Sequence, residues 1–200
     1  TLGIIGGTGC GKTTLVRLLT RDYDVTGGAV RVDGTDVREY TSRRLHAKIG
    51  LVPQAAQLFS GTVRTNLQMG CPDAADDELW RALETAQAAA FVREKQGLDT
   101  PVEEGGKNFS GGQRQRLTIA RALAAKPAVL VLDDSASALD YATDAALRRA
   151  LKTAAQGMTV VLISQRAFAV KDADEILVLD DGRPAGLGTH EELLRTCEVY

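Results

Sequence analysis

The sequence predicts an α/β fold in which a mostly parallel sheet with a small antiparallel β element is joined to a separate helical lobe. Three observations favour this fold. Short segments rich in Val, Ile and Leu alternate with helical patterns in the second half of the chain, as in parallel sheets buried on both faces. A glycine-rich loop lies between the first apolar segment and a helical pattern. Residues 62–96 are rich in Ala, Leu, Glu, Gln and Arg at helical spacing, which predicts the lobe.

The first half of the chain predicts strand, loop, helix and hairpin in that order. The dipeptide Asp33-Gly34 is typical of a hairpin turn, so the alternating segment before it predicts the small antiparallel element. A basic stretch from Arg43 to Lys48 leads into a further strand. The predicted ranges are 2–5 for the first strand, 12–20 for the helix, 27–32 for the hairpin strand and 49–52 for the last strand.

The second half predicts a loop, a capped helix and then alternating strands and helices. Residues 97–109 have no periodicity and predict a loop, after which Ser110 caps a helix that ends near Ala125. Asp181-Gly182 predicts a second hairpin turn. The predicted strands are 128–132, 159–163 and 175–179, the helices between them are 141–154 and 165–170, and a capping box over 189–192 opens a last helix.

Composition and charge exclude several classes of protein. The 200 residues are 44% hydrophobic, and 24 Lys and Arg stand against 26 Asp and Glu, for a net charge of -2. This balance argues against a polyanion-binding surface, so we expect no nucleic-acid partner. The longest apolar runs have the length of strands and fall short of the roughly 20 residues of a membrane span. The 3 cysteines have no metal-ligand spacing, which argues against a zinc site or a disulfide framework.

The glycine-rich loop satisfies the pattern G-x-x-x-x-G-K-[ST] between a predicted strand and a predicted helix. Glycines let backbone N–H groups approach phosphate oxygens, and the helix start adds a favourable dipole. Lys12 supplies positive charge, and Thr13 supplies a hydroxyl ligand for Mg²⁺. The predicted phosphate-binding residues are Gly6, Gly7, Thr8, Gly9, Cys10, Gly11, Lys12, Thr13 and Thr14. GTPases, kinases and ATPases share this pattern, which therefore does not distinguish them.

Two later segments also contain residues suited to bind phosphate or its metal ion. Asp133 and Asp134 follow a predicted strand at the end where parallel sheets position their ligands, and we expect Asp133 to bind Mg²⁺. A second arrangement suited to phosphate opens a helix at Ser110, Gly111, Gly112 and Gln113. If the chain has only one nucleotide pocket, the second anion site is predicted to complete the pocket of a neighbouring chain. ATP would then lie between the two chains.

With these motifs in this order, the chain resembles the nucleotide-binding domain of an ATP-binding cassette (ABC) transporter over nearly all its length. The loop corresponds to Walker A, residues 129–134 to Walker B, 110–113 to the signature sequence and 137–140 to the D-loop. Gln54 matches the glutamine of the Q-loop, and Gln165 occupies the switch position.

The resemblance implies a P-loop NTPase with a RecA-like core in two parts, residues 1–54 and 110–200, and an inserted α-helical subdomain at 55–109. It also implies ATP and Mg²⁺ as ligands, with Gln54 joining Thr13 and Asp133 around the metal. The partner that it implies is a second ABC nucleotide-binding domain.

Residues 57–62 and 103–106 resemble the exporter type, in which this domain follows a six-helix membrane domain on the same polypeptide. We therefore expect a fused transmembrane domain, contact with the membrane only through it, and a position at the cytoplasmic face of the cell membrane. Because Thr1 already lies in an apolar strand pattern, we expect a longer polypeptide, with the family's adenine-stacking aromatic residue upstream.

Two residues depart from the family pattern at the expected catalytic centre. Asp134 replaces the usual Glu and is one methylene shorter, and Gln165 replaces the usual His and cannot carry a proton near neutral pH. Because misplacing a catalytic group by about 1 Å can cost roughly 100-fold, we expect Asp134, Gln165 and Gln54 to form a slow site. The signature would then serve the competent site of a different partner chain.

Three alternatives remain open from the sequence. The first is a fully active homodimeric exporter. The second is a non-transport ABC ATPase of the DNA-repair or translation kind, which the short helical lobe disfavours. The third is a purely regulatory ATP-binding module, which would show no turnover.

Overall fold

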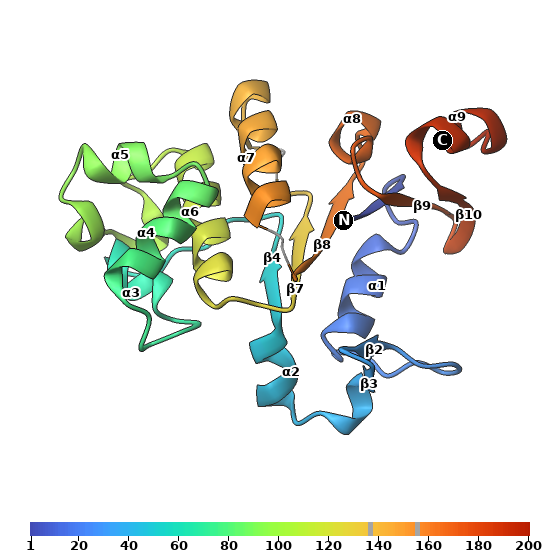
Figure 1. Cartoon of the computed structure of the whole chain (residues 1–200), viewed down its shortest axis with the longest axis horizontal. Coiled ribbons are helices and arrows are strands. Elements are labelled where there is room, and N and C mark those ends of the chain that lie inside the picture. The colour runs from blue at the N-terminus through green and yellow to red at the C-terminus, as the bar shows by residue number, and fades with distance from the viewer. Residues whose placement is uncertain (136–137, 155–156) are drawn as a thin grey trace. The chain divides into compact units, whose positions relative to one another are not determined.

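The computed structural model describes residues 1–135, 138–154 and 157–200, which fall into two compact units (Figure 1). The first unit comprises Thr1–Leu51, Ala128–Asp134 and Met158–Tyr200 and contains the large sheet. The second comprises Val52–Pro127 and Ser135–Gly157 and is mainly helical. None of the helices in the described ranges combines the length and the hydropathy that crossing a bilayer requires.

The sheet of the first unit has the strand order β10-β9-β1-β8-β7-β4. Its strands are β1 (Leu2–Gly6), β4 (Ile49–Val52), β7 (Val129–Asp133), β8 (Thr159–Ser164), β9 (Glu175–Asp180) and β10 (Arg183–Gly188). β1 pairs in parallel with β8 and with β9, and β7 pairs in parallel with β8. Among the pairings described for this sheet, only that of β10 with β9 is antiparallel, and β10 is the edge strand. The predicted parallel sheet and the second hairpin are therefore confirmed.

Short elements surround this sheet. They are α1 (Lys12–Leu19), β2 (Arg31–Val32), β3 (Thr35–Asp36), the 3-10 turn η1 (Val37–Glu39), α2 (Ser42–Lys48), α8 (Ala167–Val170) and α9 (His190–Thr196). β2 and β3 form the hairpin predicted at Asp33-Gly34. The basic stretch before β4 folds as α2, capped by the Thr41 hydroxyl, which accepts from the Arg44 N–H at 3.4 Å. Leu45 is the one buried side chain of α2, and a single apolar position gives no periodicity to detect.

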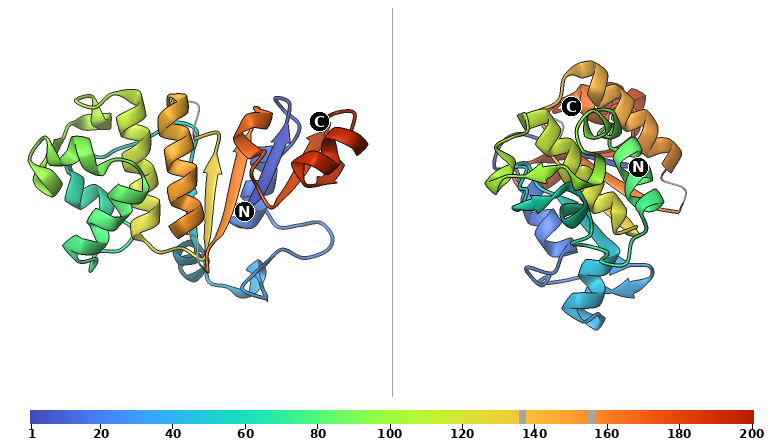
Figure 2. Two further views of the ribbon diagram at one scale, coloured as in Figure 1. Left: turned by 45° about the horizontal axis from the view of Figure 1, so that its top comes forward. Right: turned by 90° about the vertical axis from the view of Figure 1, so that its left-hand side faces the viewer.

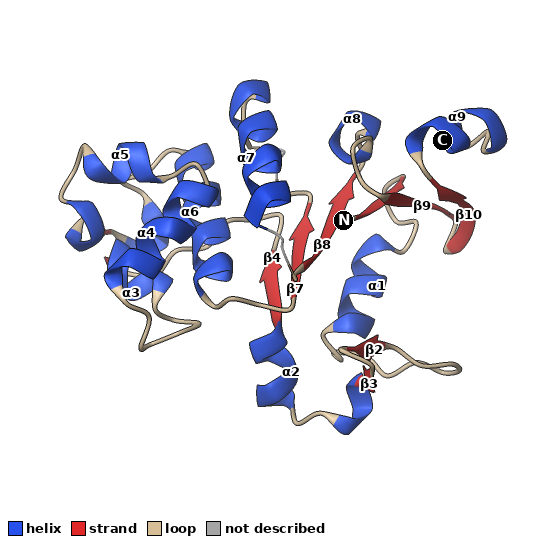
Figure 3. Cartoon of the chain, viewed as in Figure 1, coloured by secondary structure: helices blue, strands red, loops and turns tan. Residues whose placement is uncertain are grey.

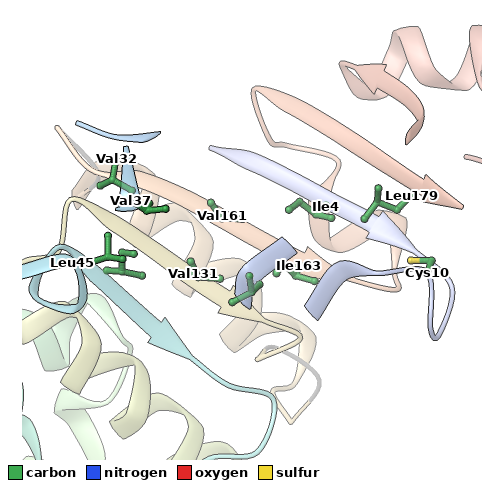
Figure 4. Packing of buried hydrophobic residues seen from close by; sticks show 11 residues of the cluster. Ile4, Cys10, Val32, Val37, Leu45, Val131, Val161, Ile163 and Leu179 are labelled. Carbon is green, nitrogen blue, oxygen red and sulfur yellow. The ribbon is translucent and has the colours of Figure 1, made fainter. Parts of the chain in front are cut away.

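Apolar side chains cover both faces of the sheet, because successive residues of a strand point to opposite sides. Ile4 of β1 joins the cluster that includes α1 and α2, whereas Ile5 packs with the cluster that includes α8 and α9. Figure 4 shows the first cluster, whose members include Ile4, Cys10, Val32, Val37, Leu45, Val131, Val161, Ile163 and Leu179. The second consists of Val170, Ala173, Ile176, Val178 and Leu193. This two-sided burial is the reason why the strands read as continuous apolar runs.

The second unit is built mainly from helices (Figure 2), and its buried side chains include Leu67, Leu79, Leu83 and Ile119. The helices are α3 (Val63–Leu67), α4 (Asp76–Thr85), α5 (Ala89–Arg93), α6 (Gly111–Ala124) and α7 (Tyr141–Ala154), with 3-10 turns η2 (Gly97–Asp99) and η3 (Glu104–Gly106). α6 packs against α3 and α4, and α7 packs against α4. The compact unit thus includes α6 and α7 as well as the predicted lobe. The division into core parts 1–54 and 110–200 and a subdomain 55–109 stays a prediction.

The predicted loop 97–109 also contains a strand, which corrects the sequence-based expectation. β5 (Gly61–Thr62) pairs antiparallel with β6 (Pro101–Val102). Strands of two residues are too short to show an alternating pattern, and their pairing depends on segments that are distant in the sequence.

Close packing at the end of β1 leads to a first prediction. A Cβ at Gly6 would lie 2.3 Å from the Leu179 carbonyl oxygen and 2.5 Å from the Cys10 Sγ. Figure 4 shows Cys10 and Leu179 near the carboxyl end of β1. Because the Leu179 oxygen belongs to a paired strand, we expect Gly6→Ala to lower the free energy of unfolding by about 3 kcal/mol. Urea denaturation without nucleotide measures this change.

Gly7→Ala is the matched control, because a Cβ at Gly7 meets no atom within 4 Å. We expect that variant to change the free energy of unfolding by less than about 0.5 kcal/mol. Equal midpoints for the two variants would contradict this account of Gly6.

Candidate functional site

The phosphate-loop sequence forms a turn between β1 and α1. Gly9 has φ 81° and Gly11 has φ 101°, both in the left-handed region that favours glycine. A Cβ at Gly7 or Gly9 would meet no atom within 4 Å, so the loop presents open backbone there. Gly11 is the N-cap of α1, and its carbonyl accepts from the Leu15 N–H at 3.1 Å. Open backbone that leads directly into a helix N-terminus fits a phosphate group.

The ammonium of Lys12 is held against this loop. Its Nζ donates to the Gly6 oxygen at 2.7 Å, to the Gly7 oxygen at 2.6 Å, and approaches the Cys10 Sγ at 3.5 Å. These contacts fix a positive charge at the position where the loop backbone is open. The predicted role of Lys12 toward phosphate is consistent with this arrangement.

The side chain of Cys10 packs into the core. Its side chain is 5% exposed and belongs to the core cluster with Ile4 and Leu179. Thr8, Thr13 and Thr14, in contrast, are exposed. We therefore expect the hydroxyl groups and the backbone, and not the thiol, to face a ligand.

Three neighbouring parallel strands end at one edge of the sheet, next to this loop. β7 and β8 are neighbouring strands (Figure 3). Ile5 of β1 is in register with Ser164 of β8, and Asp133 of β7 is in register with Ile163 of β8. The Asp134 N–H extends this pairing by donating to the Ile163 oxygen at 2.9 Å. The phosphate loop follows β1, the two aspartates lie at the end of β7, and Gln165 follows β8. They consequently lie at the same edge of the sheet, the one formed by the carboxyl ends of the parallel strands, where open parallel sheets bind ligands.

The electrostatics of Asp133 favour a bound cation. Burial raises the pKa of the Asp133 carboxyl, the charge of Asp134 raises it further, and the charge of Lys12 opposes both effects. Because the folded-state pKa lies above the unfolded value, ionisation of Asp133 opposes folding as the pH rises. A divalent cation would offset this cost, and carboxylate and hydroxyl oxygens such as those of Asp133 and Thr13 suit Mg²⁺.

Asp134 adopts an unusual backbone conformation. Its φ is 46°, in the left-handed region that Asp and Asn tolerate better than most other residues with side chains. This conformation follows the last residue of β7 directly. The sequence pattern gave no indication of it.

Gln165 is exposed in the turn between β8 and α8. The buried Ser164 before it accepts a hydrogen bond at its Oγ from the Arg166 N–H at 3.1 Å, which stabilises the turn. The amide of Gln165 can donate to an anion but cannot gain a charge.

The signature sequence lies in the second unit, at the start of α6. Ser110 and Gln113 form a capping box: the Ser110 Oγ accepts from the Gln113 N–H at 3.2 Å, and the Gln113 Oε1 accepts from the Ser110 N–H at 3.0 Å. A Cβ at Gly112 would lie 3.2 Å from the Ala138 oxygen, so glycine permits close approach of the D-loop segment. Ser110 and Gly111 are exposed.

The capping box gives a second prediction. We expect Ser110→Ala to lower the free energy of unfolding by about 1 kcal/mol, because the Gln113 N–H loses its acceptor. Chemical denaturation measures this loss, and Ser110→Thr, which keeps the hydroxyl, is the control. Equal losses in both variants would contradict the role of the hydroxyl as a cap.

Only part of the D-loop segment, residues 137–140, lies within the described residues. Ser137 lies outside them, whereas Leu139 and Asp140 are described. Asp140 accepts from the Thr143 N–H at 2.9 Å and from the Thr143 Oγ1 at 2.8 Å. These bonds lower the pKa of the Asp140 carboxyl and tie the end of the D-loop to α7.

Gln54 is exposed two residues after β4 and belongs to the second unit. Next to it, the Pro53 oxygen accepts from the Nε2 of Gln115 at 3.4 Å, and Gln115 of α6 is only 1% exposed. The sequence does not predict this link between the Gln54 segment and the signature helix. Gln115 follows the signature by two residues, but the sequence does not indicate its burial.

The first unit therefore brings together Lys12, Thr13, Asp133, Asp134 and Gln165 at one sheet edge. Gln54 and the signature belong to the other unit, so their participation in the same site remains a prediction.

The sequence of this chain is similar to those of known proteins. A sequence model of the family described as ABC transporter matches residues 1–137. An uncharacterised ABC transporter ATP-binding protein of Mycobacterium tuberculosis is 51% identical over 203 residues, covering 100% of this chain and 35% of that protein. The beta-(1→2)glucan export ATP-binding/permease protein NdvA of Rhodopseudomonas palustris is 44% identical over 195 residues, covering 97% of this chain and 33% of that protein.

The fold also resembles that of a solved structure, a bacterial Atm1-family ABC exporter with ATP bound. The TM-score is 0.91 at 39% sequence identity, and the match covers 97% of this chain and 34% of that chain. This chain thus spans about a third of the length of the proteins that it matches.

Proposed function

Since this chain belongs to the ABC transporter family, we propose that it is the ATP-binding domain of an exporter, where it binds MgATP and couples ATP hydrolysis to transmembrane export. The observation that supports ATP binding most strongly is the common edge at which the phosphate loop, the aspartate pair and Gln165 leave three adjacent strands. The relatives named as exporters support the coupling to export.

In this proposal the loop amides and Lys12 bind the phosphates of ATP. Thr13, Gln54 and Asp133 would hold Mg²⁺, which would neutralise phosphate charge. Asp134 orients the attacking water as general base, and Gln165 donates a hydrogen bond toward the γ-phosphate.

We propose that this catalytic site is slow. The carboxylate of Asp134 is one methylene shorter than that of Glu, and Gln165 cannot become a cation as His can.

The signature is proposed to act on the nucleotide of a second ABC nucleotide-binding domain. Gly111 and Gly112 lie in the first turn of α6, where backbone N–H groups have no partner within the helix and suit an anion. ATP held between two such domains would stabilise their association. A slow site beside an intact signature favours a different chain as the partner.

The helical unit is proposed to contact a fused transmembrane domain. Phe59 is 50% exposed and Met69 is 54% exposed, so both apolar side chains are candidates for this contact. The Arg121 guanidinium lies 5.6 Å from the Phe59 ring, and its buried Nη1 has no hydrogen-bond partner among the described residues. Such a domain would hold this chain at the cytoplasmic face of the membrane.

The test is the subunit composition of the full-length protein, purified in mild detergent and measured by intact-complex mass spectrometry. Two different chains in equal amounts would support the asymmetric exporter. A homodimer would overturn the proposal of a different partner and leave Asp134 and Gln165 to drive turnover. A complex without any membrane-spanning chain would overturn the exporter assignment.

A further inference from the structure

We propose that the turn between β9 and β10 positions the phosphate loop for nucleotide, through a hydrogen bond from the Gly182 N–H to the Cys10 carbonyl oxygen. The N···O distance is 3.2 Å, and both residues belong to the first unit. Gly182 is thus a positioning residue, and the inference rests on the proposed binding of ATP.

The hairpin tip approaches the loop closely. The turn consists of Asp181 with φ 42° and Gly182 with φ 75°, a left-handed pair typical of two-residue hairpins. A Cβ at Gly11 would lie 3.7 Å from the Gly182 Cα, so the tip is in van der Waals range of the loop. Packing of Cys10 with Leu179 in the core anchors the loop near the end of β9 (Figure 4).

This bond fixes the orientation of one peptide group. In a planar trans peptide, the carbonyl and the N–H point in opposite directions. Because the Cys10 carbonyl points to Gly182, the Gly11 N–H points away from the hairpin. Gly11 caps α1, so its N–H is one of the helix-start donors that can face a phosphate.

A contact from the hairpin can fix this peptide group, because the glycines of the loop leave its orientation variable. Gly9 and Gly11 flank Cys10 and adopt positive φ, and glycine populates several backbone conformations with similar ease. A rotated Cys10-Gly11 peptide would present a carbonyl in place of an N–H to the phosphate. The Gly182 bond holds the productive orientation before nucleotide arrives.

The other hairpin of the unit supplies a matched control. Asp33 has φ 50° and Gly34 has φ 76°, nearly the same turn as at Asp181-Gly182. A Cβ at Gly34 meets no atom within 4 Å, and among the described residues its N–H donates no bond to the phosphate loop.

The experiment compares Gly182→Ala with Gly34→Ala in the purified full-length protein. Each substitution forces a side chain into the left-handed region, so we expect similar decreases in the thermal midpoint. MgATP affinity, measured by displacement of the fluorescent analogue TNP-ATP, should fall about tenfold in Gly182→Ala only, as expected for one disturbed hydrogen bond. Gly182→Asn should restore affinity, since Asn tolerates the left-handed region.

Replacement of Gly182 by glycolic acid isolates the hydrogen bond itself, because the ester removes the N–H and keeps the chain unbranched. We expect weakened MgATP binding from this replacement and unchanged binding from the same replacement at Gly34. Equal affinities for the two ester variants would overturn the inference. Failure of the unmodified protein to bind MgATP would instead overturn the proposed function.

Discussion

Replacement of Lys12 by Ala is expected to raise the Kd for MgATP by about 100-fold, the largest effect on binding of any single side chain here. The ammonium is held at the loop by the Gly6 and Gly7 carbonyl oxygens, so its charge is already in place when phosphate arrives. Charge-assisted hydrogen bonds to phosphate are about twice as strong as neutral ones. Equilibrium titration with TNP-ATP, followed by displacement with MgATP, measures the change.

Lys48→Ala is the control for a general loss of positive charge. Lys48 lies in the same unit and pairs with Asp33 at 2.5 Å, on an exposed surface. We expect its removal to leave the Kd unchanged within about twofold, since surface ion pairs contribute little. If both variants weakened binding equally, the assignment of Lys12 to the phosphates would fail.

Asp134→Glu is expected to raise the rate of ATP hydrolysis, by up to about 100-fold if the missing methylene limits the reaction. The longer side chain moves the carboxylate outward by about one C–C bond, toward the position that the family pattern implies for the water. Glu tolerates φ 46° less well than Asp, so we expect stability to fall by about 1 kcal/mol while turnover rises. Phosphate release by the full-length protein at saturating MgATP measures the turnover.

Two further variants complete this series. Asp134→Asn keeps the size of the side chain and removes the base, so the residual hydrolysis should be lost. Gln165→His, combined with Asp134→Glu, should raise turnover further, because His adds a group that titrates near neutral pH. If Asp134→Glu left the rate unchanged or lowered it, the short carboxylate would be fully competent and the slow-site proposal would be wrong.

Most of the local structure could be predicted from the sequence, because its signals lie within a few residues of one another. The phosphate loop between β1 and α1 is encoded by glycine spacing and the adjacent lysine. The helix cap at Ser110, the capping box at Thr189 and the turns at Asp33-Gly34 and Asp181-Gly182 are also predicted from the sequence, and all are present. In each case a side chain or a turn dipeptide satisfies the backbone next to it.

The tertiary structure alone decided which of these local pieces meet. The sheet order, the pairing of β5 with β6 and the contact of Gly182 with Cys10 join segments that are distant in the sequence. The left-handed backbone at Asp134 occurs where β7 ends against β8, which no neighbouring residue in the sequence indicates. Such features depend on close packing between strands and loops, whose energies come from contacts that a local pattern does not contain. The sequence therefore determined the chemistry of the phosphate loop, and the fold determined which side chains and peptide groups are brought to it.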